Sequence, residues 1–173
     1  MKYLRSFFTA ALTFALVSSF LAGCSTSKKD TEFPFSEITW DATYDDMVEL
    51  EGTSDNTYDS IYGGTTYAYP KKYLDLDGTV KYMYDAEEKL MCVAWVYSAN
   101  LNDDLEKPYN TIHDALEKAH GESGYNTENS TNYGSVWYLD EGNIILSAVT
   151  TDTQKALQYS YLNPAVSSKE DEE

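Results

Sequence analysis

Two stretches of the chain carry the mixture of polar and apolar positions that is typical of a short amphipathic helix. Residues 43–49 and 111–117 align without gaps, and each opens with Thr followed three positions later by Asp. The threonine hydroxyl can accept a hydrogen bond from a backbone N–H at a helix start, and the aspartate can reach back to the cap. A glycine stands after each stretch, where a short helix would end. The pattern predicts helices at about 44–51 and 111–120.

Three runs of β character follow each predicted helix. They are separated by short clusters of Asp, Gly, Asn, Thr and Pro, which are typical of turns. The runs are residues 65–73, 79–84 and 89–98 after the first helix, and 133–139, 143–149 and 155–162 after the second. We therefore predict an α+β fold of two tandem helix-plus-three-strand repeats, forming antiparallel sheet that is covered on one face by the short helices.

The first 23 residues have the pattern of a cleavable signal peptide. Lys2 and Arg5 precede an apolar run at residues 7–20, and small residues follow the run. The run is shorter than the roughly 20 apolar residues that a transmembrane helix needs. We therefore expect residues 1–23 to direct export and to be removed.

Residues 21–24, Leu-Ala-Gly-Cys, resemble the bacterial lipobox. The resemblance implies that the thiol of Cys24 carries a diacylglycerol and that cleavage leaves Cys24 as the first residue. An ordinary signal peptide followed by a free cysteine is the alternative. Since two or more acyl chains anchor a protein stably, we expect an extracytoplasmic lipoprotein on the cell membrane or the outer membrane.

The same patterns predict six segments. They are a lipoprotein signal peptide at 1–23, the lipidated cysteine and a flexible tether at 24–36, a first α-β-β-β module at 37–98, a linker at 99–108, a second module at 109–163 and an acidic disordered tail at 164–173.

Charge narrows the choice of partner. Lys2 and Arg5 are two of the 12 basic residues, so the chain from Cys24 onward has 10 basic and 29 acidic residues, a formal −19. All ten basic residues are lysines, and arginine is the usual bidentate reader of phosphate and guanine. A chain of this charge repels nucleic acid, so we expect no nucleic-acid partner. The acidity favours solubility or long-range selection of a cationic partner.

The arrangement resembles the SmpA/OmlA (BamE-like) family of small bacterial lipoproteins, and its tandem form resembles β-lactamase-inhibitor proteins. Trp40-Asp41-Ala42-Thr43 keeps the aromatic residue and the cap of the family's aromatic-Gly-x-Thr/Ser motif, but has Asp41 in place of Gly. The second predicted helix ends His-Gly at 120–121, where the family often has Tyr-Gly. Over residues 37–162 the resemblance implies this fold and protein–protein binding without catalysis.

Side chains for metal or catalytic chemistry are few. His113, Glu117 and His120 lie along one side of the second predicted helix and are weak candidates for a zinc site; a solvated helix face explains them as well. The sequence Asp-Leu-Asp-Gly at 75–78 resembles the start of a calcium loop, but a tight turn explains it equally well. Cys92 falls in a predicted strand, where we expect a small buried hydrophobe. We therefore predict no enzyme, no metal and no cofactor.

Aromatic residues in the predicted strands are the best candidates for binding. We expect a concave sheet face that binds an unidentified envelope or extracellular protein, with aromatic anchors. The alternative is a small-ligand or glycan-binding lipoprotein that uses the same aromatic face. The candidate anchors are Tyr67, Tyr69, Tyr82, Tyr84, Trp95, Tyr97, Trp137, Tyr159 and Tyr161.

Overall fold

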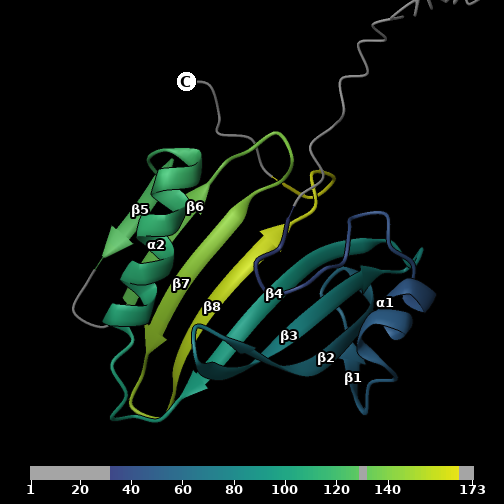
Figure 1. Ribbon diagram of the computed structural model, residues 1–173, viewed down its shortest axis with the longest axis horizontal. Coiled ribbons are helices and arrows are strands. Elements are labelled where there is room, and N and C mark those ends of the chain that lie inside the picture. Colours follow the sequence, from purple (N-terminus) through teal and green to yellow (C-terminus); the bar gives the residue numbers. More distant parts are fainter. Residues whose placement is uncertain (1–31, 129–131, 168–173) are drawn as a thin grey trace, which may run out of the picture.

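The computed structural model describes residues 32–128 and 132–167 (Figure 1). The signal peptide at 1–23, Cys24, most of the tether and the tail from residue 168 lie outside the described residues. The elements, in chain order, are α1 (Tyr44–Glu51), β1 (Asn56–Asp59), β2 (Gly63–Tyr73), β3 (Leu76–Asp85), β4 (Leu90–Ala99), α2 (Glu106–His120), β5 (Tyr125–Glu128), β6 (Asn132–Trp137), β7 (Ile144–Thr150) and β8 (Lys155–Leu162).

The strands form one antiparallel sheet rather than two modules. Its order is β1-β2-β3-β4-β8-β7-β6-β5, so the two halves of the chain join where β4 pairs with β8. The prediction of two tandem helix-plus-three-strand repeats is therefore wrong. Each half contributes four strands, and the pairing of β4 with β8 makes them a single eight-stranded sheet.

The two strands that the sequence pattern did not reveal are the edges of the sheet. β1 has the sequence Asn-Thr-Tyr-Asp and β5 the sequence Tyr-Asn-Thr-Glu, and all residues in both are exposed. A short polar edge strand has no buried face, so it lacks the period-two apolar pattern by which strands are recognised. The other six strands overlap the six predicted runs.

The two helices differ in how they begin. At α1 the capping box is confirmed: the N–H of Asp46 donates to the Thr43 hydroxyl at 3.2 Å, and the N–H of Thr43 donates to the Asp46 carboxylate at 2.8 Å. α2 begins at Glu106, inside the predicted linker 99–108, so the interpretation of Thr111 as its cap is wrong. The Thr111 hydroxyl instead donates to the backbone carbonyl of Lys107 within the helix.

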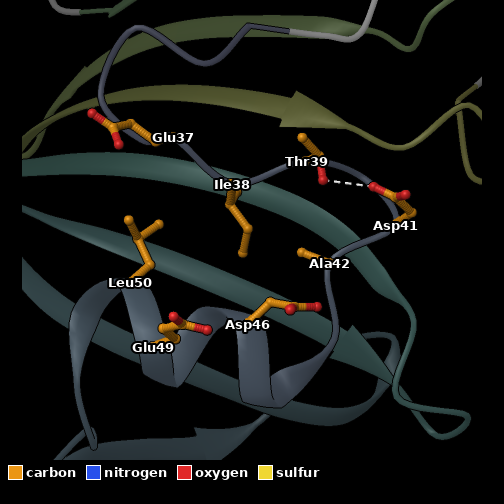
Figure 2. A pocket seen from close by; sticks show the side chains of 8 residues that line it. All are labelled: Glu37, Ile38, Thr39, Asp41, Ala42, Asp46, Glu49 and Leu50. Carbon is orange, nitrogen blue, oxygen red and sulfur yellow. Dashed lines mark hydrogen bonds between the residues drawn. The ribbon is translucent and has the colours of Figure 1, made fainter.

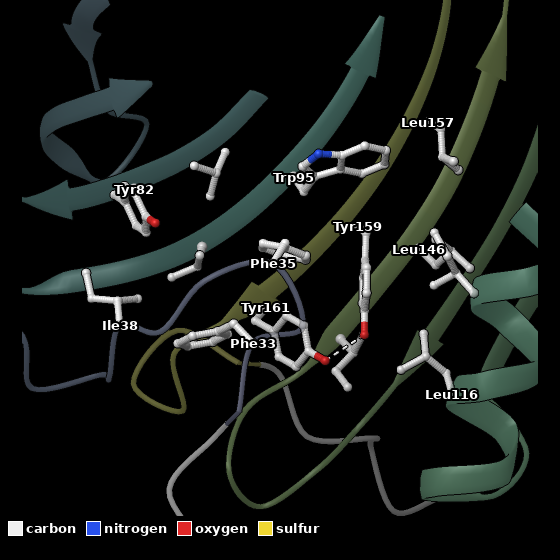
Figure 3. Close-up of a cluster of buried hydrophobic side chains, with 14 of the residues drawn as sticks. Phe33, Phe35, Ile38, Tyr82, Trp95, Leu116, Leu146, Leu157, Tyr159 and Tyr161 are labelled. Carbon is white, nitrogen blue, oxygen red and sulfur yellow. Dashed lines mark hydrogen bonds between the residues drawn. The ribbon is translucent and has the colours of Figure 1, made fainter. Parts of the chain in front are cut away.

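Both helices and an N-terminal segment pack on the same face of the sheet (Figure 1). We call residues 32–42 the strap; it crosses the centre of that face, between α1 and α2. Phe33, Phe35 and Ile38 of the strap are buried in the core formed there (Figure 3). Neither helix within the described ranges has the length and apolar composition needed to cross a bilayer.

Candidate functional site

The nine predicted aromatic anchors point into the core. Tyr67 and Tyr97 are partly buried and pack against it, and the other seven are buried: Tyr69, Tyr82, Tyr84, Trp95, Trp137, Tyr159 and Tyr161. Buried side chains cannot form an accessible binding platform, so the structure does not support these residues as anchors. The register decides the outcome, because a shift of one residue would place every one of these rings on the opposite face.

The buried tyrosine hydroxyls have structural partners. The Tyr82 hydroxyl lies 2.7 Å from the Ser36 hydroxyl and donates at 2.6 Å to Glu51, which also accepts from Lys71 at 3.0 Å. Burial raises the pKa of Tyr82 well above its usual value. This network connects α1 and the strap to the sheet. Its polar atoms are already hydrogen-bonded within the protein, so their role is structural rather than ligand binding.

The opposite face of the sheet carries neither helix nor strap, and we call it the open face. The strand register assigns it the even-numbered residues 56–58 in β1, 66–72 in β2, 92–98 in β4, 132–136 in β6 and 156–162 in β8, and the odd-numbered residues 77–83 in β3, 125–127 in β5 and 145–149 in β7. Their side chains are mostly Ala, Val, Ser, Thr, Asn, Gln and Ile.

Charge is almost absent from the open face. Its charged members are Lys72, Asp77 and Lys81, and the first two lie 3.8 Å apart as an ion pair. The open face therefore has a formal charge of +1 in a chain whose net charge is −17. Within the strand ranges given above, Asp77 is the one acidic residue that the register assigns to the open face.

The centre of the open face consists of small side chains. Cys92, Ala94 and Ser160 are buried there although no helix covers them, because longer neighbours surround them. The prediction for Cys92 is confirmed: the thiol is buried, and burial raises its pKa to about 12. Tyr62, in the turn between β1 and β2, reaches this thiol from the margin. A protonated, buried thiol is a poor nucleophile, so Cys92 contributes packing rather than chemistry.

Exposed apolar side chains lie toward both edges of the open face. Tyr58 is 44% exposed on β1, Tyr125 is 53% exposed on β5 and Val149 is 44% exposed on β7. Eight strands about 4.8 Å apart that rise about 3.3 Å per residue make a face of roughly 34 by 23 Å, or about 800 Å². One partner contributes about this area to a standard protein–protein interface.

An acidic groove runs between the strap and α1 (Figure 2). Its volume is about 570 Å³, and its carboxylates are Glu37, Asp41, Asp46 and Glu49. Two of them already have local partners: Asp41 accepts from the Thr39 hydroxyl at 2.6 Å, and Asp46 completes the α1 cap. Hydrogen bonds from Thr43 lower the pKa of Asp46. The groove therefore offers local capping interactions rather than a converging set of ligand atoms.

The weak metal candidates separate in the structure. His113 lies near Asp114 and Glu117, whereas His120 is exposed and outside this group. His113 Nδ1 is 4.0 Å from an Asp114 oxygen, and its Nε2 is 3.9 Å from a Glu117 oxygen. One ligand atom from each of His113, Asp114 and Glu117 lies within 4.8 Å of the others, but both carboxylates are exposed. An exposed His–Glu pair at i, i+4 is also ordinary on a helix surface.

The calcium-like motif forms a turn. Leu74 and Asp75 have φ of 48° and 62°, and they connect β2 to β3 between the paired residues Tyr73 and Leu76. Two successive residues with positive φ are the requirement of a tight hairpin turn. Asp77, beyond the turn, pairs with Lys72. The aspartates of the motif therefore belong to a β-hairpin.

Comparison with known proteins does not identify a family. No protein family matches the sequence, and no curated protein sequence matches it. One solved structure is similar, a DUF4309 family protein (YjgB) from Bacillus subtilis subsp. subtilis str. 168. It has 12% sequence identity and a TM-score of 0.44, over 76% of this chain and 87% of that one. A likeness at this level does not carry an activity or a partner to this chain, and the BamE-like resemblance stays a prediction.

Proposed function

We propose that this chain is a membrane-anchored, extracytoplasmic lipoprotein that binds another protein without catalysis, and that the open face is its binding surface. The observation that carries the proposal is the near absence of charge on that face in a strongly acidic chain. The centres of protein–protein interfaces are likewise depleted of charged residues. The face also has the area of one side of a standard interface.

The acidic remainder of the surface supports the same proposal. A large net charge keeps a protein soluble and discourages unspecific association through the charged surface. A partner protein that approaches the open face has few charged side chains to desolvate, so association costs less free energy there than on the acidic surface. The partner surface that fits it carries apolar and uncharged polar side chains, with tyrosines such as Tyr58 and Tyr125 at the margin as contacts.

The glycan-binding alternative has less support from the geometry. A small-ligand site is a cleft with a few converging polar groups, and sugar recognition would use exposed aromatic faces. The aromatic side chains proposed for that role point into the core. The acidic groove beside α1 is lined by four carboxylates, two of which have local partners, and by no aromatic ring. We therefore retain protein binding as the proposed function.

The binding surface can be tested by site-specific photo-crosslinking in intact cells. A photoreactive amino acid at Tyr125 is expected to form a discrete adduct with a second protein. The additional substitution Val149→Asp is expected to weaken that adduct at least tenfold, because it places an unpaired charge inside the interface. Leu101→Asp is the matched control, because Leu101 is 50% exposed in the loop between β4 and α2. Adducts that respond equally to both substitutions would remove the open face from the proposal.

The membrane anchor can be tested separately. Cys24→Ala removes the thiol that a diacylglycerol would occupy, so the protein is expected to move from the membrane fraction to the soluble or secreted fraction. Fractionation and immunoblotting measure this change, with Cys92→Ala as the matched cysteine control that leaves membrane attachment unchanged. Full retention of the Cys24→Ala protein in the membrane would contradict a lipid anchor at Cys24.

A further inference from the structure

A second pocket lies where the start of α1 meets the first residues of β2 and the last residues of β3. Its volume is about 290 Å³, close to the lower end of the range for small-molecule sites, so a ligand that fits it is small. Tyr67 of β2 and Tyr84 of β3 bring it to the side of the sheet that α1 covers. The proposed protein-binding surface does not include this pocket.

Three tyrosines line the pocket, and their rings form one cluster. The centroid of the Tyr67 ring lies 4.9 Å from that of Tyr44 and 5.9 Å from that of Tyr84. The planes of Tyr67 and Tyr84 are 80° apart, so the rings form walls in two directions rather than one flat stack. Tyr44 and Tyr67 are half-buried and Tyr84 is buried. The electron-rich faces of such rings attract a cation that comes within about 6 Å of a centroid.

The charged residues that line the pocket are acidic. They are Asp85 and Glu88, and no basic residue lines it. Glu88 is exposed and forms no ion pair with the described residues. The N-terminus of α1 brings a partial positive charge nearby, but Asp45 and Asp46 in its first turn offset this charge. The pocket therefore favours a positively charged ligand.

The backbone around the pocket has an irregular pairing. The register of β2 with β3 shifts between Gly63 and Thr66, and that of β3 with β4 shifts between Met83 and Tyr84. At Gly64 the two strands approach so closely that a Cβ would overlap the carbonyl oxygen of Asp85. Bulges of this kind are over-represented beside active sites, where they change the direction of a side chain. The shape of the pocket is therefore set by the sheet itself.

We propose that this pocket binds a methylated ammonium group, carried by a small free cation or by a lipid headgroup. The methyl groups of such a cation spread its charge and pack against the tyrosine rings, while the nearby carboxylates balance the charge. A primary ammonium is strongly hydrated and needs hydrogen-bond acceptors instead. Here Asp85 Oδ1 already accepts two backbone N–H groups of the turn at 2.9 Å each, and the Tyr84 hydroxyl already donates to the Thr43 carbonyl.

Calorimetric titration of the purified protein with related ligands tests the proposal. Choline carries the methylated ammonium, its isostere with a tert-butyl group in place of the trimethylammonium is uncharged, and ethanolamine lacks the methyl groups. Choline is expected to bind at one saturable site, at least about tenfold more tightly than either of the others. If the uncharged isostere binds equally well, apolar burial explains the binding; if ethanolamine does, simple charge attraction explains it. Either result would overturn the proposal.

Substitutions locate the bound cation. Tyr67→Leu is expected to weaken choline binding at least about tenfold, because it removes the central ring, and Glu88→Gln about threefold, because it removes a nearby charge. The matched controls are Tyr58→Leu on β1 and Glu122→Gln after α2, which are exposed and expected to leave binding unchanged. Circular dichroism checks that each variant is folded, and exposed Glu88 supplies a test even if Tyr67→Leu is unstable. Equal effects of pocket and control variants would mean unspecific attraction to an acidic chain and would exclude the site.

Vesicles distinguish the two sources of the ammonium group. The Cys24→Ala protein, which lacks the thiol of the proposed lipid anchor, is sedimented with phosphatidylcholine vesicles in the presence and absence of free choline. Retention that choline abolishes assigns the pocket to the lipid headgroup, and saturable binding of choline without retention assigns it to a free cation. Absence of choline binding would overturn the proposal for both sources. The open face takes no part in these measurements, so their failure would leave the proposed protein binding unaffected.

Discussion

Replacing Trp95 with alanine is expected to lower the free energy of unfolding by about 4 kcal/mol, the cost of removing a large buried ring. Trp95 lies in β4, is fully buried and donates from its indole nitrogen to the backbone carbonyl of Lys71 at 2.9 Å. Gly78 lies directly against this ring: a Cβ at Gly78 would come within 2.5 Å of it. The two positions are thus fitted to each other, and the truncation leaves a cavity that the backbone at Gly78 cannot fill.

Urea unfolding followed by circular dichroism measures this change. Val149→Ala is the matched control on the open face, and it is expected to change the free energy of unfolding by less than about 0.5 kcal/mol. Gly78→Ala is expected to destabilise as well, because its new methyl group would clash with the ring. A Trp95→Ala protein as stable as the control would mean that the ring is not packed as described.

Raising the pH above 10 is expected to unfold the protein in one cooperative step. Burial raises the pKa of Tyr161 to about 12 and raises the pKa of Tyr82, Tyr84 and Tyr159 further. The folded chain therefore keeps these protons at pH values at which the unfolded chain releases them. Their stabilisation is present below pH 10 and is lost as the pH rises, by roughly 5 kcal/mol per pH unit for four tyrosines. At this slope, typical domain stabilities of 5–15 kcal/mol place unfolding between about pH 11 and pH 13.

Tyrosinate absorbance and circular dichroism, recorded along the same titration, test this expectation. The buried tyrosines are expected to ionise only as the fold is lost, so both signals change together. Tyr161→Phe removes one titrating group and is expected to reduce the slope of stability with pH by about 1.4 kcal/mol per unit. Ionisation of all tyrosines near pH 10 with the fold retained would contradict the burial of these hydroxyls.

The residues that stabilise the fold and the residues of the proposed binding surface lie on opposite faces of the sheet. Trp95, Tyr159 and Tyr161 stabilise the covered face under the helices and the strap. Substitutions on the open face remove no core contact at exposed positions such as Val149 and Tyr125. Substitutions at these exposed positions are therefore expected to change binding without changing the free energy of unfolding. A test of the interface needs variants of this kind.

Local patterns allowed much of the secondary structure to be predicted. The Thr43–Asp46 box is a contact three residues apart, and the six internal strands have apolar periods that can be recognised within ten residues. The start of α2 could not be predicted from a capping motif, because Leu105 at its N-cap makes no side-chain hydrogen bond. β1 and β5 were not predicted because both faces of these edge strands are exposed, so their sequences have no alternation of apolar and polar residues.

The sequence alone determined the excess of acidic residues, the lipobox-like motif at Cys24 and most of the local elements. The motif and the elements depend on residues that are close together along the chain, so no tertiary contact is needed to recognise them. The pairing of Cys92 with Leu162 across 70 residues, and with it the union of both halves in one sheet, depends on contacts that no local pattern encodes. The same pairing sets the register of β4 and β8. In this register Trp95 and Tyr159 point into the core, and Val96 and Gln158 lie on the open face. The binding surface is a product of that register, because alternate residues of a strand always face opposite sides.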